Sequence, residues 1–480
     1  MRALRREGTA DDGWARIGRA SLAAEECGRL FGELRGARAC LPPLRLLLGF
    51  ERATFGRRAG GDVVASAVGL ALMDSTRQKK GPLSALFLTV FVDLVGFGIL
   101  IPLQPYLALE FGASKSGVTG LNWAYSAAQF LMAPVWGRLS DRIGRRPVLL
   151  VSIAGSIFTQ LLFAGTQLFH HGLSPAAGLA LLYVARIGAG ACGANIATAQ
   201  AVIADSTTPE NRARGMGMIG AAFGLGFIVG PALGGGLDHF GHAAPLLFAA
   251  GLSAVNLLLA FRRIPETRRP GAASAAPRRA RLAELWSALL LPGLGALLVL
   301  QLLVTFAFAN MEATLALLVD DRFGWASGRV GGLFALAGVV LVVFQGGLVG
   351  RLARRYGERA LLLFGIALLA AGMFLLPYVP HAGGVYLAMI ALAAGQGLAS
   401  PSLSSLLSRS AASDRQGSTL GLSASMGSLG RIFGPIWGGL AYDQWRFAAP
   451  YLSAGAVLLL ALFFGAVALR RPAAVPAVEA

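Results

Sequence analysis

Uncharged stretches long enough to cross a membrane recur along this chain, and they limit its fold more than any other feature. Each holds about 18 or more residues, which as a helix can span a hydrocarbon core of about 30 Å. The stretches are too long and too continuously apolar for the strands of a membrane barrel, in which apolar and polar residues alternate. Charged residues make up 14% of the chain, against about 25% in soluble domains. The sequence therefore predicts an all-α, polytopic membrane protein.

Twelve predominantly apolar stretches predict twelve transmembrane helices. Nineteen arginines lie in one set of alternate loops, whereas the other set holds only Lys115 and three arginines. Because basic residues favour the cytoplasmic side, both termini are predicted to face the cytoplasm. The approximate helix ranges are 83–109, 118–137, 147–168, 178–204, 213–237, 243–262, 289–319, 328–350, 359–379, 383–408, 417–441 and 448–469.

The remaining segments divide the chain into five parts. Residues 1–72 are rich in arginine and acids, and their apolar run is too short to span a membrane, so they are predicted to be a poorly ordered N-terminal extension. We favour Met73 as the biological start; a disordered cytoplasmic tail is the alternative. Residues 73–262 and 289–470 each hold six helices, the segment 263–288 is a flexible cytoplasmic linker, and residues 471–480 form a tail.

Other classes of protein fit the sequence poorly. The net charge of +18 comes from arginines in short loops rather than on one exposed face, which argues against a nucleic-acid partner. The three cysteines have neither disulfide nor metal spacing, and the predicted spans contain no histidine, so no metal site and no enzyme activity are expected. A phosphate-binding loop that would indicate ATP-driven pumping is absent.

Two pairs of similar segments indicate an internal duplication. GRLSDRIGRR, which begins at Gly137, shares six identities with GRLARRYGER, which begins at Gly350. GFIVGPALGG, from Gly226, shares six identities with GRIFGPIWGG, from Gly430. The offsets, 213 and 204 residues, are nearly equal. Two copies of one six-helix unit, related by an axis along the membrane normal, are typical of a known transporter architecture.

With these motifs, the chain resembles the major facilitator superfamily, and within it the drug:proton antiporters of the tetracycline-resistance group. The resemblance covers about residues 82–469. It rests on six segments in the expected order: DLVGFGILIPLQP, GRLSDRIGRRP, YVARIGAG, IADSTTPENRARGMG, GFIVGPALGG and IPET. It implies the major facilitator fold, with two pseudo-symmetric bundles of six helices, in a bacterial inner membrane.

The resemblance gives roles to two of these motifs. The first arginine-rich turn is expected to be a cytoplasmic latch that closes one side of the transporter, formed by Gly137, Asp141, Arg142, Gly144, Arg145 and Arg146. In this motif the glycines are expected to permit a tight turn, with Asp141 just beyond the helix end. A basic loop that only fixes topology is the alternative. The small residues Gly226, Gly230, Pro231, Gly234 and Gly235 are expected to let a neighbouring helix come close, as in exporters.

A charged residue inside a membrane span costs free energy, so each one in the predicted spans is treated as a candidate functional residue. Asp93 and Glu312 are the candidate proton carriers, and Arg186 is the candidate cation that tunes them. Burial favours a protonated carboxyl group and a nearby arginine favours its charged form, so such a group can load and release a proton. Structural interhelical bonds remain the alternative for both acids. Arg431 lies in the second glycine motif and is expected to serve helix packing.

Polar side chains within the spans predict a mixed substrate cavity. They are Asn122, Gln129, Gln200, Gln301, Thr305, Gln345 and Gln396. With nearby aromatic residues, this lining suits an amphipathic molecule better than a sugar, although each amide could instead make an interhelical contact. Tetracycline pumps of the family carry an acid-aromatic pair midway along helix 3; here Thr159 and Gln160 stand there. This departure argues against tetracycline itself.

The sequence thus predicts a secondary active transporter that exports an amphipathic, drug-like molecule in exchange for protons, by alternating access. Its partners would be the substrate, protons and the bilayer, with no cofactor, and it would act as a monomer. A symporter or facilitator that imports a nutrient with the same fold is the alternative, against which the exporter motif on helix 5 argues.

Overall fold

The computed structural model describes residues 82–194, 198–199, 202–203, 209–267, 290–291, 293–410 and 416–469. These residues belong to one compact unit, Lys79–Ala480. The predicted extension 1–72, the start at Met73, most of the linker and the tail 471–480 lie outside the described residues.

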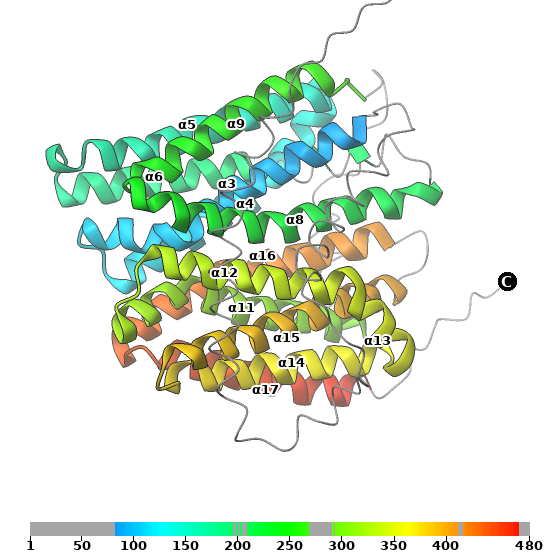
Figure 1. Cartoon of the computed structure of the whole chain (residues 1–480). Coiled ribbons are helices and arrows are strands. Elements are labelled where there is room, and N and C mark those ends of the chain that lie inside the picture. Colours follow the sequence, from blue (N-terminus) through cyan, green and yellow to red (C-terminus); the bar gives the residue numbers. More distant parts are fainter. Residues whose placement is uncertain are drawn as a thin grey trace, which may run out of the picture. The chain divides into compact units, whose positions relative to one another are not determined.

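The described part of the chain is helical and contains no strand (Figure 1). An N-terminal half holds six long helices: α3 (Pro82–Glu110), α4 (Lys115–Ile143), α5 (Arg145–Leu168), α6 (Pro175–Gly193), α8 (Pro209–Leu237) and α9 (Ala243–Arg263). A C-terminal half holds α11 (Leu294–Phe323), α12 (Ser327–Val343), α13 (Val349–Tyr356), α14 (Glu358–Leu375), α15 (Ala382–Arg409), α16 (Gln416–Trp445) and α17 (Ala449–Ala468). Because a π-helical turn, η4 (Phe344–Leu348), joins α12 to α13, this half also has six helical rods.

Several predicted boundaries shift for local reasons. Helix 7 begins at Leu294 rather than 289, directly after Gly293, whose φ of 89° is not helical. Helix 2 does not stop at Gly137 but continues to Ile143, and the chain turns only at Gly144, with φ 105°. Helix 4 is described as α6 up to Gly193, and parts of the predicted segment 194–204 lie outside the described residues.

Nine of the described helical segments are long and apolar enough to cross a membrane. The three remaining long helices, α4, α8 and α16, are less apolar because glycine, serine and alanine fill much of their sequences. These three helices make most of the contacts between the halves: α8 packs against α12, and α4 packs against α16. Their small and polar residues face protein rather than lipid, which accounts for the weaker hydropathy.

Within each half, one glycine-rich helix packs tightly against the first helix of that half. In the N-terminal half α8 lies along α3, and in the C-terminal half α16 lies along α11. Figure 1 shows α8 also running beside α12 of the other half. The same arrangement therefore occurs twice, as the sequence duplication predicts.

One end of the helices carries the α4–α5 and α13–α14 turns, and we call it the arginine-rich end. At the opposite end, charged groups join the two halves. The carboxylate of Asp443, at the end of α16, accepts hydrogen bonds from the backbone N–H groups of Lys115 and Ser116, at 3.1 and 2.9 Å. Lys115 also pairs with Asp321 at 2.7 Å. This opposite end is therefore held together in the structure.

A second set of polar contacts lies at this same end, between α12 and the segment that follows α8. The hydroxyl of Ser327, the first residue of α12, donates to the carboxylate of Asp238. His242 contacts the same carboxylate at 2.7 Å and reaches Glu110, the last residue of α3, at 3.0 Å. Each glycine-rich helix thus leads to an aspartate that touches the first turn of a helix from the other half.

Candidate functional site

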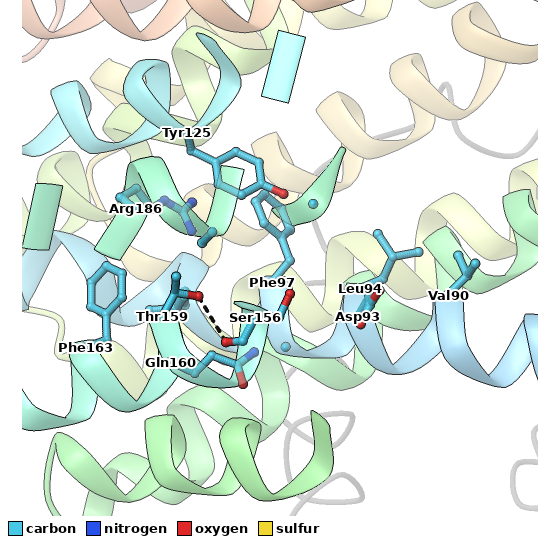
Figure 2. Close-up of a pocket in the computed structure, with 14 residues that line it drawn as sticks. Val90, Asp93, Leu94, Phe97, Tyr125, Ser156, Thr159, Gln160, Phe163 and Arg186 are labelled. Atoms are coloured by element: carbon cyan, nitrogen blue, oxygen red, sulfur yellow. Dashed lines mark hydrogen bonds between the residues drawn. The ribbon is translucent and has the colours of Figure 1, made fainter. Parts of the chain in front are cut away.

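Asp93, Arg186 and Tyr125 border one internal pocket of the N-terminal half. The pocket also receives Thr159 and Gln160 from α5, so four helices contribute to it (Figure 2). An acid in this place lies among protein groups rather than among lipid chains. The structure therefore brings two of the three predicted proton-coupling residues, Asp93 and Arg186, to one site.

Arg186 is the largest side chain that is fully buried in the described structure. Its guanidinium stacks on the rings of Tyr125 and Phe97, with 4.5 and 5.3 Å between its central carbon and the ring centroids. It also donates a long hydrogen bond of 3.4 Å to Asn122, whose side-chain oxygen accepts a second bond from Gln104. Cation–π contacts of this kind stabilise a buried guanidinium. The arginine is therefore held by aromatic faces and one amide.

Thr159 and Gln160, the residues that replace the expected acid-aromatic pair, are both buried at the pocket. Gln160 accepts a hydrogen bond of 3.1 Å from Ser253 of α9. Its amide nitrogen lies over Gly96, where an added Cβ would approach within 2.7 Å. Gly96 thus makes room for the amide, and Thr159 and Gln160 give the pocket neutral polar groups on the α5 side.

The pocket has a volume of about 60 Å³. Pockets that enclose drug-sized ligands measure roughly 300–1,000 Å³. The space around Asp93 in this conformation therefore suits a few water molecules, and a larger ligand requires the surrounding helices to move.

Glu312 borders a second, smaller pocket between the halves. Phe227 of α8 and Phe308, Phe334 and Met389 of the C-terminal half also line it, and Glu312 is its only charged residue among those described. Two arginines act on Glu312 electrostatically, and the influence of Arg431 is larger than that of Arg186. The predicted acid–arginine group therefore spans both halves.

The residues predicted to line the substrate cavity differ in their surroundings. Asn122 and Gln129 make hydrogen bonds within the protein. Asn122 accepts from Gln104 and Arg186, and Gln129 donates to the backbone oxygen of Gly193 at 3.1 Å. Gln301 donates to Thr305 at 2.9 Å, so this predicted pair does lie together. Gln345 is exposed in the π-helical turn, and the side-chain oxygen of Gln396 is buried without a hydrogen-bond partner in the described structure. Gln200 lies outside the described residues.

The first arginine-rich turn has a definite structure. Arg145 donates to Asp141 at 2.7 Å and to Ser140 at 2.8 Å, which confirms an aspartate–arginine contact. Two details of the prediction were wrong. Asp141 lies inside the last turn of α4 rather than beyond it, and Gly137 is helical with open space around it, because the helix continues to Ile143. Only Gly144 makes the tight turn, and Arg142 is exposed.

Glu266, in the IPET segment after α9, completes this turn. One of its carboxylate oxygens accepts from the backbone N–H of Arg145 at 2.9 Å, and the other accepts from that of Arg146 at 3.0 Å. A carboxylate is stabilised at a helix N-terminus, where backbone donors are unpaired. Gly144 makes room for it, because an added Cβ would collide with the carboxylate. Arg146 holds the same segment by donating to the backbone oxygen of Phe261 at 2.6 Å.

The second copy of the turn is built differently. Gly357, the counterpart of Gly144, has a φ of 81°, but nothing lies within 4 Å of an added Cβ. Glu358 follows it as the first residue of α14 and accepts from Ser405 at 2.6 Å. The two turns therefore differ in structure, and Arg354 stands where Asp141 stands in the first copy.

The small residues of α8 bring helices together, as predicted. An added Cβ on Gly230 would lie 2.7 Å from the Cα of Gly98, and one on Gly226 would lie 2.7 Å from the Cβ of Leu94. Gly234 meets the backbone of Ile99, so these three glycines face α3. Gly235 instead faces α12, 3.0 Å from the Cα of Gly328. Pro231 also touches both neighbours, since added Cβ atoms on Gly98 and Gly331 would meet it.

Sequence reasoning missed two contacts. The motif IPET was noted without a role for Glu266, because the helix start that Glu266 caps lies 121 residues earlier in the chain. Arg186 stacks on Phe97 and Tyr125, and the three residues come from three helices. No pattern within one segment of the sequence could predict this contact. Among the described residues, no group of three or more His, Cys, Asp or Glu side chains is placed so that it could hold a metal ion.

Comparisons with known proteins agree with this geometry. The tetracycline resistance protein, class G, of Vibrio anguillarum is 35% identical over 356 residues, which are 73% of this chain and 87% of that protein. Multidrug resistance protein 1 of Bacillus subtilis (strain 168) is 27% identical over 391 residues, covering 80% of this chain and 97% of that protein.

A solved structure is also similar. The human organic anion transporter MFSD10 (TETRAN) matches with a TM-score of 0.61 and 28% identity, over 80% of this chain and 98% of that chain. The family model of the Major Facilitator Superfamily matches residues 86–435 and 346–480, which is more than half of the chain. These matches confirm the family predicted from the sequence motifs: the chain belongs to the Major Facilitator Superfamily.

Proposed function

We propose that this chain exports amphipathic, drug-like molecules in exchange for protons, by alternating access of a central site to the two sides of the membrane. The arginine-rich end faces the cytoplasm, as do both termini, and the protein acts as a monomer in a bacterial inner membrane. No cofactor takes part, because the proton gradient drives transport.

The proposal depends chiefly on the position of Asp93. This acid borders an internal pocket together with Arg186 and Tyr125, and the pocket has room for water. A carboxyl group in such a place is favoured in its protonated form by burial and in its charged form by a nearby arginine. Movement of α3 relative to α6 changes the balance between these two effects, so the proton is taken up in one conformation and released in the other.

Glu312 supports a second coupling position. It lies in the other half, between Phe227 and Phe308, within electrostatic reach of Arg431 and Arg186. Because both arginines act on it and they belong to different halves, any relative motion of the halves changes the field at this carboxyl group. Such sensitivity is what proton coupling to alternating access requires.

The turn between α4 and α5 supports the latch. Asp141 and Arg145 are paired, and Glu266 ties the start of α5 to the segment that leads into the linker. This brace holds the arginine-rich ends of α4, α5 and α9 as one rigid group that moves together when the halves tilt.

The relatives support the direction of transport and the class of substrate, since those at 35% and 27% identity are named for tetracycline and multidrug resistance. The neutral pair Thr159 and Gln160 at the pocket favours a drug-like molecule other than tetracycline.

A susceptibility panel tests the proposal. The chain is expressed in an efflux-deficient bacterial host, and growth is measured against a set of amphipathic antibiotics that includes tetracycline, with and without a protonophore. Resistance to at least one drug that the protonophore abolishes is expected. Asp93→Asn and Glu312→Gln should each lose this resistance while the protein remains in the membrane, whereas Asp320→Asn, an acid at the end of α11, should retain it. Drug accumulation above that of the empty host would indicate import instead.

A further inference from the structure

Arg431 occupies an unusual position in the middle of α16. Its side chain is exposed, and the guanidinium lies near Gly427, one turn earlier, on the side of α16 where Gln301 and Thr305 of α11 also lie. Its electrostatic partners, Glu312 of α11 and Tyr125 of α4, come from different halves. The sequence suggested a packing role for Arg431, because it follows Gly430 in the second glycine motif. In the structure Gly430 packs against Leu302 and Phe306 of α11, whereas the Arg431 side chain is exposed and donates to Ser428.

Three polar groups converge beside Arg431. A Cβ placed on Gly427, one turn earlier on α16, would lie 3.3 Å from the amide nitrogen of Gln301 and 3.8 Å from both the Arg431 guanidinium and the Thr305 hydroxyl. Gly427 carries no side chain, so no methyl group separates these three polar groups from the backbone of α16. An amide N–H, a guanidinium and a hydroxyl are all hydrogen-bond donors, and together they suit a negatively charged oxygen.

The charge of Arg431 is not neutralised by a contact. Within the described helices no carboxylate pairs with it at 4.0 Å or less, and its one side-chain hydrogen bond goes to the hydroxyl of Ser428 at 3.3 Å. Glu312 acts on it only from a distance. A guanidinium inside a membrane protein is costly when it lacks a partner, and such residues mark substrate pathways.

Aromatic rings lie around the same interior. The ring of Phe97 is 5.1 Å from that of Tyr125 and 6.2 Å from that of Phe227, between ring centroids. Phe308 lines the adjoining pocket with Glu312. Tyr125 is within electrostatic reach of Arg431, and flat apolar faces in the same interior as this cation favour a planar aromatic molecule with an acidic group at one edge.

We propose that Arg431, with Gln301 and Thr305, binds the acidic group of an aromatic organic anion and so determines which molecules this transporter accepts. This inference rests on the proposed function for the site's role in transport, but the binding itself can be measured separately. The guanidinium supplies the charge, while Gln301 and Thr305 orient the carboxylate or enolate. Gly427 provides the room that the anion needs.

Direct binding to the purified full chain tests the inference. The probes are fluorescein, an aromatic anion, and ethidium, an aromatic cation of similar size, and their fluorescence anisotropy is measured in detergent. Wild-type protein should bind fluorescein, and Arg431→Gln should weaken that binding about tenfold or more, the loss typical of a charge-assisted hydrogen bond. Arg431→Lys should retain part of the affinity, because the charge remains but the planar fork is lost.

A matched pair of glycine variants separates the anion position from general damage to α16. Gly427→Ala places a methyl group at the point where the three donors converge and should weaken fluorescein binding several-fold. Gly421→Ala lies on the same helix with nothing within 4 Å of the new Cβ, and should leave it unchanged. Ethidium binding should change little in any of these variants.

Several results would overturn the inference: no fluorescein binding by the wild type, equal losses for fluorescein and ethidium in Arg431→Gln, or equal effects of the two glycine variants. Failure of the proposed function looks different, since it would appear as absent or protonophore-insensitive resistance while the anisotropy results stand.

Discussion

The two glycine-rich helices, α8 and α16, share the glycines that pack them but differ in the side chain that follows the first glycine of the motif. Gly226, Gly230 and Gly234 face α3, and their counterparts Gly430, Gly434 and Gly438 face α11 in the same way. The last glycine of each motif turns to the other half, Gly235 to α12 and Gly439 to α4. The residue after the first glycine differs, since it is Phe227 in α8 and Arg431 in α16.

This difference separates two kinds of constraint. The glycines set how closely the backbones approach, and both copies keep them because neither interface tolerates a side chain there. The next position faces the interior, where one copy supplies an aromatic surface and the other a cation. Duplication therefore preserved the packing and left the chemistry of the interior free to diverge.

The largest loss of stability and transport should come from adding a methyl group at the glycines by which α8 and α16 pack against α3 and α11. Gly230→Ala would place a Cβ 2.7 Å from the Cα of Gly98, and Gly434→Ala would place one 3.0 Å from the backbone nitrogen of Asn310 and closer still to the carbonyl oxygen of Phe306. Backbone atoms cannot move aside as side chains can, so each change should destabilise the protein by about 1–3 kcal/mol and abolish transport. Thermal unfolding in detergent and the resistance assay measure both effects.

Gly236→Ala is the control for these variants, because nothing lies within 4 Å of its added Cβ. If α8 tolerated alanine at Gly230 while α16 did not at Gly434, the two helices would not share one packing frame.

The next effect distinguishes the two arginine-rich turns. Gly144 and Gly357 both have backbone angles that only glycine adopts readily, with φ of 105° and 81°, so alanine should cost about 1–3 kcal/mol at either site. Gly144→Ala should cost more, because its methyl group also collides with Glu266, whereas the space around Gly357 is open. Comparison of the melting temperatures checks this order.

Gly137→Ala serves as the reference for that pair. Its backbone is helical and its surroundings are open, so alanine should leave the melting temperature unchanged or raise it slightly, by the equivalent of about 0.5–1 kcal/mol. A large loss of stability at Gly137 would contradict the helical description of this motif.

A smaller effect is expected from the helix cap. Glu266→Gln removes the charge at the start of α5 but keeps an oxygen that can accept one backbone hydrogen bond. The free energy of unfolding should fall by about 1 kcal/mol. Glu358→Gln is the comparison at the start of α14 in the other copy and should cost a similar amount or less, since Glu358 accepts from the Ser405 side chain and pairs with the exposed Arg409 at 3.7 Å. Denaturation of the two variants in parallel measures the difference.

The smallest effect should come from Lys115→Ala at the opposite end. Its ion pair with Asp321 is partly exposed, and such pairs contribute about 0–1 kcal/mol. Asp443→Ala should cost more, because it removes the acceptor of two backbone hydrogen bonds at the start of α4. Unfolding measurements in which Lys115→Ala proved the more damaging would reverse this order.

The sequence was a good guide to the helices and to the family, because both depend on local patterns. Apolar length and basic loops located the spans, and the duplicated motifs located the interface glycines. The error at Gly137 has a clear cause: glycine, arginine and aspartate suggest a loop, but tertiary packing extends α4 through them. The joining of Arg186 to Phe97 and Tyr125 could not be read from spacing, because these residues come from three helices whose rotations are set by packing.

The interior position of Arg431 was missed for a related reason. Its neighbours in sequence are packing glycines, and sequence alone does not show which side of α16 faces α11. Once Gly430 is placed against Phe306 and Leu302, the next residue necessarily points elsewhere on the helix.

The cap that the Asp443 carboxylate makes on the start of α4 limits which mutations can remove this contact between the two halves. One partner is a side chain, while the other consists of main-chain amides that every residue except proline possesses. Replacement of Ser116 by almost any amino acid therefore leaves that amide available to the carboxylate, so mutations that remove this cap are concentrated in a single codon, that of Asp443.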